Sequence, residues 1–228
     1  MKIVISIGGS IIAPLNLDVE YIKRFSGFVK ELSERHSVGI VVGGGRIARD
    51  YISVSRSFGA SEFFSDLIGI EASRLNAMLL TASLHGIGVR VNKKPALTIE
   101  GAAREMGHHG AAVMGGTHPG HTTDGVAAML AEYTGADLLI NATSIDGVYT
   151  ADPKKDPGAE KIERLNFDEL IEIVGRGEAT AGRSTIIDLV AAKVMKRSRI
   201  RTCVLDGRDL ENMRDAVSGK KFVGSVIE

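Results

Sequence analysis

The sequence predicts an α/β protein with an open, mainly parallel sheet sandwiched between helices. Short β-branched runs alternate along the chain with segments of helical spacing, and clusters of glycine follow several of these runs. The chain has 228 residues, 44% of them hydrophobic and 25% charged, which is enough to bury the core of such a fold. In open α/β sheets, ligands bind beyond the carboxyl ends of the strands. We therefore expect the glycine clusters to mark the functional site.

The first elements form a β-α-β unit. Residues 2–7 are an apolar, mostly β-branched run ended by Gly8 and Gly9, which is typical of a strand buried on both faces. Residues 18–35 place apolar side chains at three- and four-residue spacing and predict an amphipathic helix. Residues 38–42 repeat the first pattern and end at a triple glycine. They predict a second strand, parallel to the first.

The rest of the chain continues the alternation. A helix is predicted to begin near Arg46, and a longer one to begin at Asp66 and end at Gly86, where glycine stops it. Further strands are expected at residues 89–92, 111–114, 137–142, 201–205 and 222–227, and further helices at residues 123–133, 167–174 and 184–197. A polar, turn-rich segment follows residue 152. We expect one domain, residues 1–228, with a soft boundary near Gly135 between lobes 1–135 and 136–228.

Composition excludes several classes of protein. Lys plus Arg equals Asp plus Glu at 28 each, so the chain lacks the positive charge of a bulk nucleic-acid binder. No apolar stretch approaches the roughly 20 residues that span a bilayer. The single cysteine, Cys203, rules out an intrachain disulfide and is expected to be a core thiol. We expect a cytoplasmic protein that binds neither nucleic acid nor membrane.

Two glycine turns indicate phosphate binding. Gly8, Gly9 and Ser10 follow the first strand, and a triple glycine that includes Gly44 and Gly45 follows the second. Glycine lets backbone amides approach an anion closely, and the start of a helix adds positive potential. One such turn can be only a tight βα connection, but two at adjacent strand ends favour two phosphates that face each other. Neither turn fits the Walker or the dinucleotide-binding motif.

The third glycine cluster, residues 114–124, is dense in hydroxyl and imidazole groups. Its threonine hydroxyls and glycine amides form a neutral cradle that suits an anion, a sugar or a base. His118 and His121 have a spacing that also allows metal binding, with Asp124 as a third ligand. We favour substrate binding and predict no metal site, because no cysteine or third histidine accompanies them and Asp124 can equally cap the following helix.

Three charged residues near these turns have two interpretations each. Arg49 lies one helical turn after the triple glycine, where it can reach the second phosphate, and we favour that role over a solvated position. Arg46 stays open between the same two roles. Asp66 is either a helix N-cap or an acceptor for hydrogen bonds from a substrate sugar or base.

Five segments, which occur in the family's order and spacing, resemble the amino acid kinase superfamily and, within it, uridylate (UMP) kinases of archaeal type. They are KIVISIGGS (2–10), VVGGGRIAR (41–49), SDLIG (65–69), VMGGTHPGHTTD (113–124) and TSIDGVYTADPKKDP (143–157). The resemblance covers essentially the whole chain. It implies a carbamate kinase-like three-layer fold, transfer of the γ-phosphoryl group of ATP to UMP in pyrimidine nucleotide synthesis, Mg²⁺ with the ATP, and assembly into a hexamer.

The resemblance also implies roles for residues at matching positions. ATP would contact Gly8, Gly9, Ser10, Gly45, Arg49, Thr143, Asp146, Tyr149 and Asp152. UMP would contact Gly44, Asp66, Met114, Gly115, Gly116, Thr117, His118, Pro119, Gly120, Thr122 and Thr123. Catalytic roles fall to Gly45, Arg49, Lys193 and, through orientation of the site, Asp188. A core position remains the alternative for Tyr149.

The sequence departs from the family pattern at Ser6. Many members carry a lysine there, which would neutralise charge on the transferred phosphoryl group, so another cation must substitute. Lys193 matches a lysine that other branches use near the donor phosphates, although it can also be a surface lysine with a buried stem.

Two other functions remain open. One is a kinase of the same fold for another phosphate or carboxylate acceptor, although residues 113–124 have too few cations for an amino-acid carboxylate. The other is a nucleotide-binding storage or scaffold protein without turnover, which the missing lysine supports.

Overall fold

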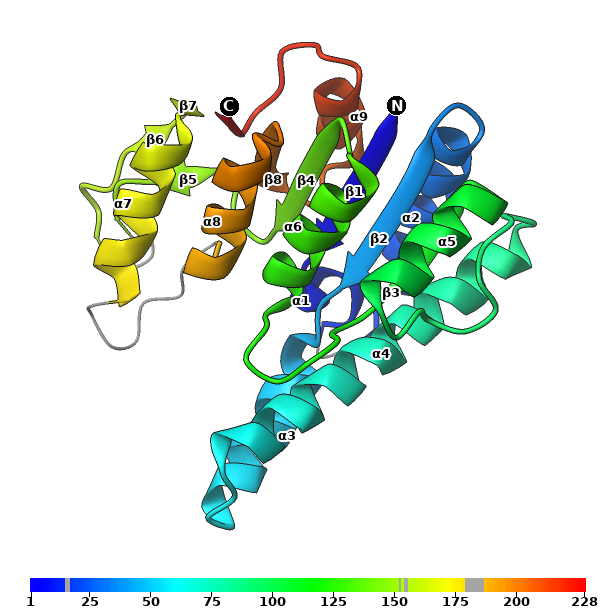
Figure 1. Cartoon of the computed structure of the whole chain (residues 1–228), viewed down its shortest axis with the longest axis horizontal. Helices are drawn as coiled ribbons and strands as arrows, with labels where there is room; N and C mark the ends of the chain where they lie inside the picture. Colours follow the sequence, from blue (N-terminus) through cyan, green and yellow to red (C-terminus); the bar gives the residue numbers. More distant parts are fainter. Residues whose placement is uncertain (15–16, 152, 154–155, 179–186) are drawn as a thin grey trace.

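A seven-stranded sheet runs through the molecule, in the order β3-β2-β1-β4-β8-β9-β7 (Figure 1). The computed structural model describes residues 1–14, 17–151, 153, 156–178 and 187–228. The strands are β1 (Lys2–Ile7), β2 (Ser37–Val42), β3 (Ala111–Met114), β4 (Leu138–Thr143), β7 (Arg164–Leu165), β8 (Thr202–Asp206) and β9 (Ser225–Ile227). Strands β3, β2, β1, β4 and β8 are parallel, whereas β9 runs antiparallel to β8. The predicted mainly parallel sheet is confirmed.

Helices cover both faces of the sheet. One apolar core joins it to α2 (Val19–Ser33), α4 (Glu62–Gly86) and α9 (Leu210–Val217). The other core joins it to α5 (Ile99–His109), α6 (Thr123–Thr134), α7 (Phe167–Glu178) and α8 (Leu189–Ser198). The side chains of β1 alternate between the two cores, as the pleat of a strand requires. This is the three-layer arrangement that the sequence predicts.

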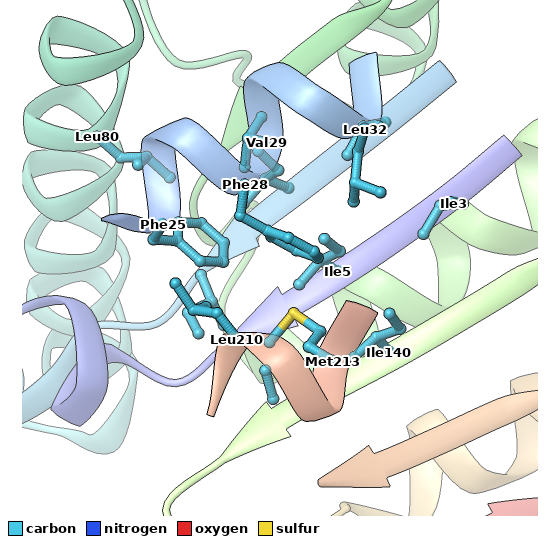
Figure 2. Packing of buried hydrophobic residues seen from close by; sticks show 14 of the residues in the cluster. Ile3, Ile5, Phe25, Phe28, Val29, Leu32, Leu80, Ile140, Leu210 and Met213 are labelled. Carbon is cyan, nitrogen blue, oxygen red and sulfur yellow. The ribbon is translucent and has the colours of Figure 1, made fainter. Parts of the chain in front are cut away.

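The packing of α2 shows how the amphipathic pattern is used. Phe25 and Phe28 are fully buried and point toward β1, and Leu80 of α4 and Met213 of α9 close the same cluster from either side (Figure 2). Asp18 caps the helix by accepting a hydrogen bond from the Tyr21 amide at 2.9 Å. The helix matches the prediction, and its cap is one that Asp commonly provides.

Two further pairs of elements complete the chain. After β2, α3 (Gly45–Ser57) packs along α4, and together these helices extend away from the sheet (Figure 1). A separate two-stranded sheet pairs β5 (Val148–Tyr149) with β6 (Lys161–Ile162). The short helix α1 (Gly9–Ile12) directly follows β1. No helix in the described part of the chain has the length and apolar character required to cross a membrane.

Several predicted elements differ from the structure. Residues 89–92 form no strand, because the side chain of Asn92 takes the place of a strand ladder: it accepts from Val113 N and donates to Val113 O, both at 2.8 Å. Helix α5 was not predicted, since residues 99–109 contain two glycines and few apolar side chains. Helix α8 begins at Leu189, later than the predicted start, and residues 179–186 lie outside the described residues. Cys203 is buried, as predicted, and burial raises the pKa of its thiol to about 11.

Candidate functional site

The turns that end β1 and β2 touch each other backbone to backbone. A Cβ atom on Gly9 would lie 2.1 Å from Gly45 N and 2.4 Å from Gly43 O, so only glycine fits there. Gly45 also has a φ of +66°, which other residues rarely adopt. The amide of Gly43 donates to Ile7 O at 3.0 Å and fixes the second turn against the end of β1. The expected convergence of the two turns is therefore confirmed.

A cavity of about 320 Å³ opens beside this junction, between α4 and the segment that follows β3. Residues of the predicted acceptor site form much of its wall, namely Gly44, Asp66, Gly116, Gly120, Thr122 and Thr123. Gly45 also lines it, together with Ala48, Gly69, Ile70, Ser73 and His121, which the acceptor prediction did not include. The structure thus brings three distant parts of the chain around one small polar space.

Asp66 closes one side of this cavity. It lies within the first turns of α4, whose N-cap is Ser61, so its predicted position at the helix start is wrong. Its Oδ2 accepts a hydrogen bond from Gly120 N at 2.7 Å. Gly120 has a φ of +81°, a conformation suited to glycine. Asp66 therefore ties α4 to the loop after β3, as well as lining the cavity.

Three polar residues of α4 form hydrogen bonds with the backbone of the turn after β2 and of the loop after β3. The sequence analysis did not predict any of them. Ser73 Oγ accepts from Gly116 N at 2.7 Å. Arg74 Nε donates to Gly116 O at 3.1 Å, and Asn76 Nδ2 donates to Gly43 O at 2.9 Å. The signal that could have found them is a polar group in the middle of an otherwise apolar helix, SRLN at residues 73–76.

Behind the first glycine turn, Ser6 faces Asp124. Ser6 Oγ donates to Asp124 Oδ1 at 2.8 Å. Removal of this carboxyl group from water raises its pKa to about 6, and the negative charge of Asp188 adds to the effect, while hydrogen bonds from Ser6 and Asn141 oppose it. Helix α6 is capped by Thr122 and not by Asp124. The sequence left a capping role open for Asp124, and the structure gives that role to Thr122.

Asp188 joins α6 to α8. One of its carboxylate oxygens accepts from Val190 N at 2.8 Å and from Ala191 N at 2.9 Å, which makes it the N-cap of α8. The other accepts a hydrogen bond from Thr122 Oγ1. Thr122 in turn accepts from Gly125 N at 3.1 Å. Asp188 therefore orients a threonine that lines the cavity.

On the side of β4, the predicted ATP residues Thr143, Asp146 and Tyr149 lie in and after the end of that strand. Tyr149 Oη donates to Asp146 Oδ1 at 2.7 Å, and Lys161 Nζ donates to Asp146 Oδ2 at 3.0 Å. Partial burial opposes ionisation of Asp146, but these two hydrogen bonds, the charge of Lys161 and a backbone hydrogen bond together hold the pKa of the carboxyl group below its usual value. Asp152, also predicted here, lies outside the described residues.

The predicted cations lie outside the wall of the cavity. Arg49 on α3 and Lys193 on α8 are both exposed. Arg46 Nε lies 3.2 Å from Asp50 Oδ2 in an exposed ion pair, which is the solvated position considered for it. The structure therefore brings together the glycines and hydroxyls of the predicted site but leaves its two cations at the surface.

The remaining predicted residues divide between core and surface. Met114, Gly115 and Thr117 are buried, and Met114 belongs to the apolar core on the α6 face. His118 and Ser10 are exposed, and Pro119 is half-buried. Within the described ranges, no group of three or more His, Cys, Asp or Glu side chains could hold a metal ion.

The chain is similar in sequence and in fold to known proteins. The sequence model of the amino acid kinase family matches residues 1–206. The chain is 46% identical to the uridylate kinase of Pyrococcus abyssi, with 100% of each protein covered. It is similar in fold to the crystal structure of uridylate kinase from Archaeoglobus fulgidus, with a TM-score of 0.89, 45% identity and 100% of each chain covered. UMP kinase from Ureaplasma parvum shares the fold at 21% identity, with a TM-score of 0.82 over 100% of this chain and 98% of that chain.

Proposed function

The chain belongs to the amino acid kinase family, and we propose that it is a UMP kinase, which transfers the γ-phosphoryl group of ATP to UMP and yields UDP and ADP in pyrimidine nucleotide synthesis. The observation that carries this proposal is the contact between the glycine turns after β1 and β2. The backbone of Gly9 meets that of Gly43 and Gly45 there, and the small cavity adjoins this contact. A triphosphate on one side and a monophosphate on the other would meet there end to end.

The reaction asks little covalent chemistry of the protein. An oxygen of the UMP phosphate attacks the γ-phosphorus as the bond to ADP breaks, and charge spreads over the equatorial oxygens. A phosphate acceptor is largely ionised near neutral pH, since its second pKa is about 6, so no general base is required. Alignment and hydrogen-bond donors account for the rate.

We assign the acceptor to the cavity and the donor to the β4 side. Asp66, Thr122, Thr123 and the amides after β3 would hold UMP, while Gly8, Gly9 and Ser10 would hold the ATP phosphates. Thr143, Asp146 and Tyr149 would hold the ATP nucleoside. Arg49 and Lys193 would turn inward when the phosphates bind. Residues 1–135 then form the acceptor lobe and residues 136–228 the donor lobe of one domain.

Magnesium accompanies ATP in this proposal. Mg²⁺ prefers oxygen ligands and keeps several waters. The carboxylates of this region already accept hydrogen bonds within the protein: Asp124 from Ser6, Asp188 from the first amides of α8 and Asp66 from Gly120. This donor set fits an ion carried mainly by the phosphates, with no dedicated cage of protein ligands. When bound, the ion neutralises phosphate charge.

We further propose a cytoplasmic homo-oligomer, a hexamer as the family resemblance implies. Its support is the outer face of α3 and α4, where large apolar side chains are exposed: Tyr51, Val54, Phe58, Phe63, Phe64, Leu67 and Leu75. Two apolar grooves of about 400 and 440 Å³ lie on this face. Exposed apolar surface of this extent favours a protein partner, and we assign it to a second copy of the chain.

The test is an assay of ADP release with ATP, Mg²⁺ and a panel of acceptors: UMP, CMP, acetylglutamate, aspartate, carbamate and isopentenyl phosphate. We expect turnover with UMP and little with the carboxylates. Turnover with a carboxylate and none with UMP would refute the proposal. Tight ATP binding without release of ADP for any acceptor would support a storage or scaffold protein instead.

A further inference from the structure

Lys161 lies beside the proposed donor site. It is in none of the sequence motifs that predicted the site, and it does not line the cavity. It begins β6, where it pairs directly with Tyr149 of β5 across an antiparallel ladder. Its Nζ lies 3.0 Å from Asp146 Oδ2, and Tyr149 Oη lies 2.7 Å from Asp146 Oδ1. The two opposed residues of the ladder therefore grip both oxygens of one carboxylate.

The side chain of Lys161 packs closely against the backbone of Gly147, the residue after Asp146. Gly147 has a φ of +151°, and a Cβ atom there would lie 3.1 Å from Lys161 Cδ and 2.8 Å from Ser225 Oγ. Ser225 of β9 accepts from Val148 N at 2.8 Å and donates to Ile162 O at 2.5 Å. One serine of the main sheet thus pins both strands of the small sheet, and the stem of Lys161 packs under the turn.

Asp146 also interacts with a second carboxylate, that of Asp206. Partial burial acts to raise the pKa of Asp206, but the hydrogen bonds and charge of Arg208 hold it below its usual value. The charge of Asp146 opposes this lowering, so the two carboxylates interact. Asp206 has its own cation, because Arg208 Nε donates to its Oδ1 at 2.8 Å. Arg208 also donates to Ser144 O at 3.2 Å. Lys161 therefore supplies the positive charge that pairs with Asp146, as Arg208 does for Asp206.

We propose that Lys161 is a positioning residue of the donor site, which fixes the Asp146 carboxylate so that it accepts a hydrogen bond from a ribose hydroxyl of the nucleotide. This inference rests on the proposed function, which places the ATP nucleoside beside Asp146. The carboxylate has about four lone-pair positions, of which Tyr149, Lys161 and the backbone amide of Asp146 occupy three, so it can still accept a hydroxyl. Lys161 touches the carboxylate and not the substrate.

The test compares Lys161→Met, which keeps the apolar stem, with Lys161→Arg, which keeps the cation. Lys220→Met is the matched control, because Lys220 is an exposed lysine paired with Asp215 at 3.6 Å on the surface. Calorimetric titration without UMP measures the affinity of each variant for ADP, 2′-deoxy-ADP and 3′-deoxy-ADP. Thermal melting and turnover at saturating UMP and ATP accompany it.

In Lys161→Met we expect ADP to bind about tenfold more weakly, since a charge-assisted hydrogen bond no longer fixes its acceptor. The preference for ADP over at least one deoxy analogue should fall with it. Lys161→Arg should recover most of that preference. At saturating UMP and ATP, kcat of both Lys161 variants should stay within about twofold of the wild type. The control, Lys220→Met, should match the wild type.

Two outcomes would overturn the role of Lys161. One is unchanged ADP affinity in Lys161→Met, and the other is an equal loss for all three nucleotides with a lower melting temperature and no rescue by arginine. A wild-type protein that binds ADP but gives no turnover with UMP contradicts the acceptor assignment alone. A wild-type protein that does not bind ADP overturns both proposals.

Discussion

At the scale of single residues, the buried carboxyl group of Asp124 makes the stability of the fold depend on pH. The residue keeps some exposed surface, but its carboxyl group points inward to Ser6 and to Asn141. Its pKa rises from 3.8 to about 6, so the folded chain holds this proton more tightly than the unfolded chain does. Stability from this group is therefore greatest at low pH and falls as the pH rises from about 4 to 6.

We predict that Asp124→Asn raises stability at neutral pH. The shift corresponds to at most about 3 kcal/mol at pH 7, because the ionised carboxylate no longer has to be buried. Urea unfolding at pH 4 and pH 7 measures the free energy of unfolding. This free energy should be larger for the variant than for the wild type at pH 7 but not at pH 4. An equal difference at both pH values would show that the carboxyl group does not titrate as described.

Arg49 carries a prediction about the transition state. Arg49→Ala should lower kcat/KM for UMP by about 10² or more, the scale of losing one donor to the transferring phosphoryl group. Arg46→Ala is the matched control, since Arg46 lies one turn earlier on α3 and pairs with Asp50. Steady-state kinetics of both variants decide the point. If the two variants behave alike, Arg49 has no special role.

At the scale of elements, α4 organises the site. Its residues Ser73, Arg74 and Asn76 bond the backbone of the loop after β3 and of the turn after β2. Its other side carries exposed apolar residues such as Leu67 and Leu75. The helix therefore contributes polar side chains to the loops beside the cavity on one side and presents apolar side chains on the other.

Arg74→Ala tests the grip of α4 on the loop. We expect KM for UMP to rise about tenfold with little change in kcat, because the carbonyls of Gly116 and Thr117 lose their donor while the glycine junction is untouched. Arg74→Lys should recover little, since lysine cannot reproduce the fork. Arg164→Ala on β7, which breaks an exposed pair with Glu228, serves as the control. Unchanged KM in Arg74→Ala would contradict the assignment.

Much of the fold could be predicted from sequence because the signals were local. The buried runs of β1 and β2 are continuous and end in glycine, which needs no knowledge of the rest of the chain. Residues 89–92 have the same composition as a strand, yet Asn92 satisfies the backbone of Val113 through its side chain. Arg74 and Lys161 were missed because their partners lie far along the chain or across a ladder.

At the scale of the whole molecule, the face of α3 and α4 exposes more apolar surface than a monomer is expected to leave in contact with water. Phe58 is 80% exposed and Leu75 is 61% exposed. Such side chains are normally covered when they gather on one face. The sequence could not locate this face, since the residues come from two helices whose mutual packing had to be known first.

We predict that Leu75→Glu reduces the molecular mass of the assembly in solution. A charge placed in the groove against an apolar partner surface is costly to bury. Light scattering coupled to size-exclusion chromatography measures the mass, and circular dichroism checks that the variant is folded. Leu97→Glu is the control, because Leu97 is similarly exposed at 59% but lies away from this face. Equal masses for both variants would mean that the face is not the interface.

The backbone contact between Gly9 and the second turn sets a limit on how this protein can be altered. Because this junction consists of main-chain atoms of glycines, no side-chain substitution can reshape it without breaking the contact. Redesign toward a new acceptor therefore has to begin at the rim, among the residues of α4 and the threonines opposite them. The spot where the two substrates meet would stay the same while the specificity around it changes.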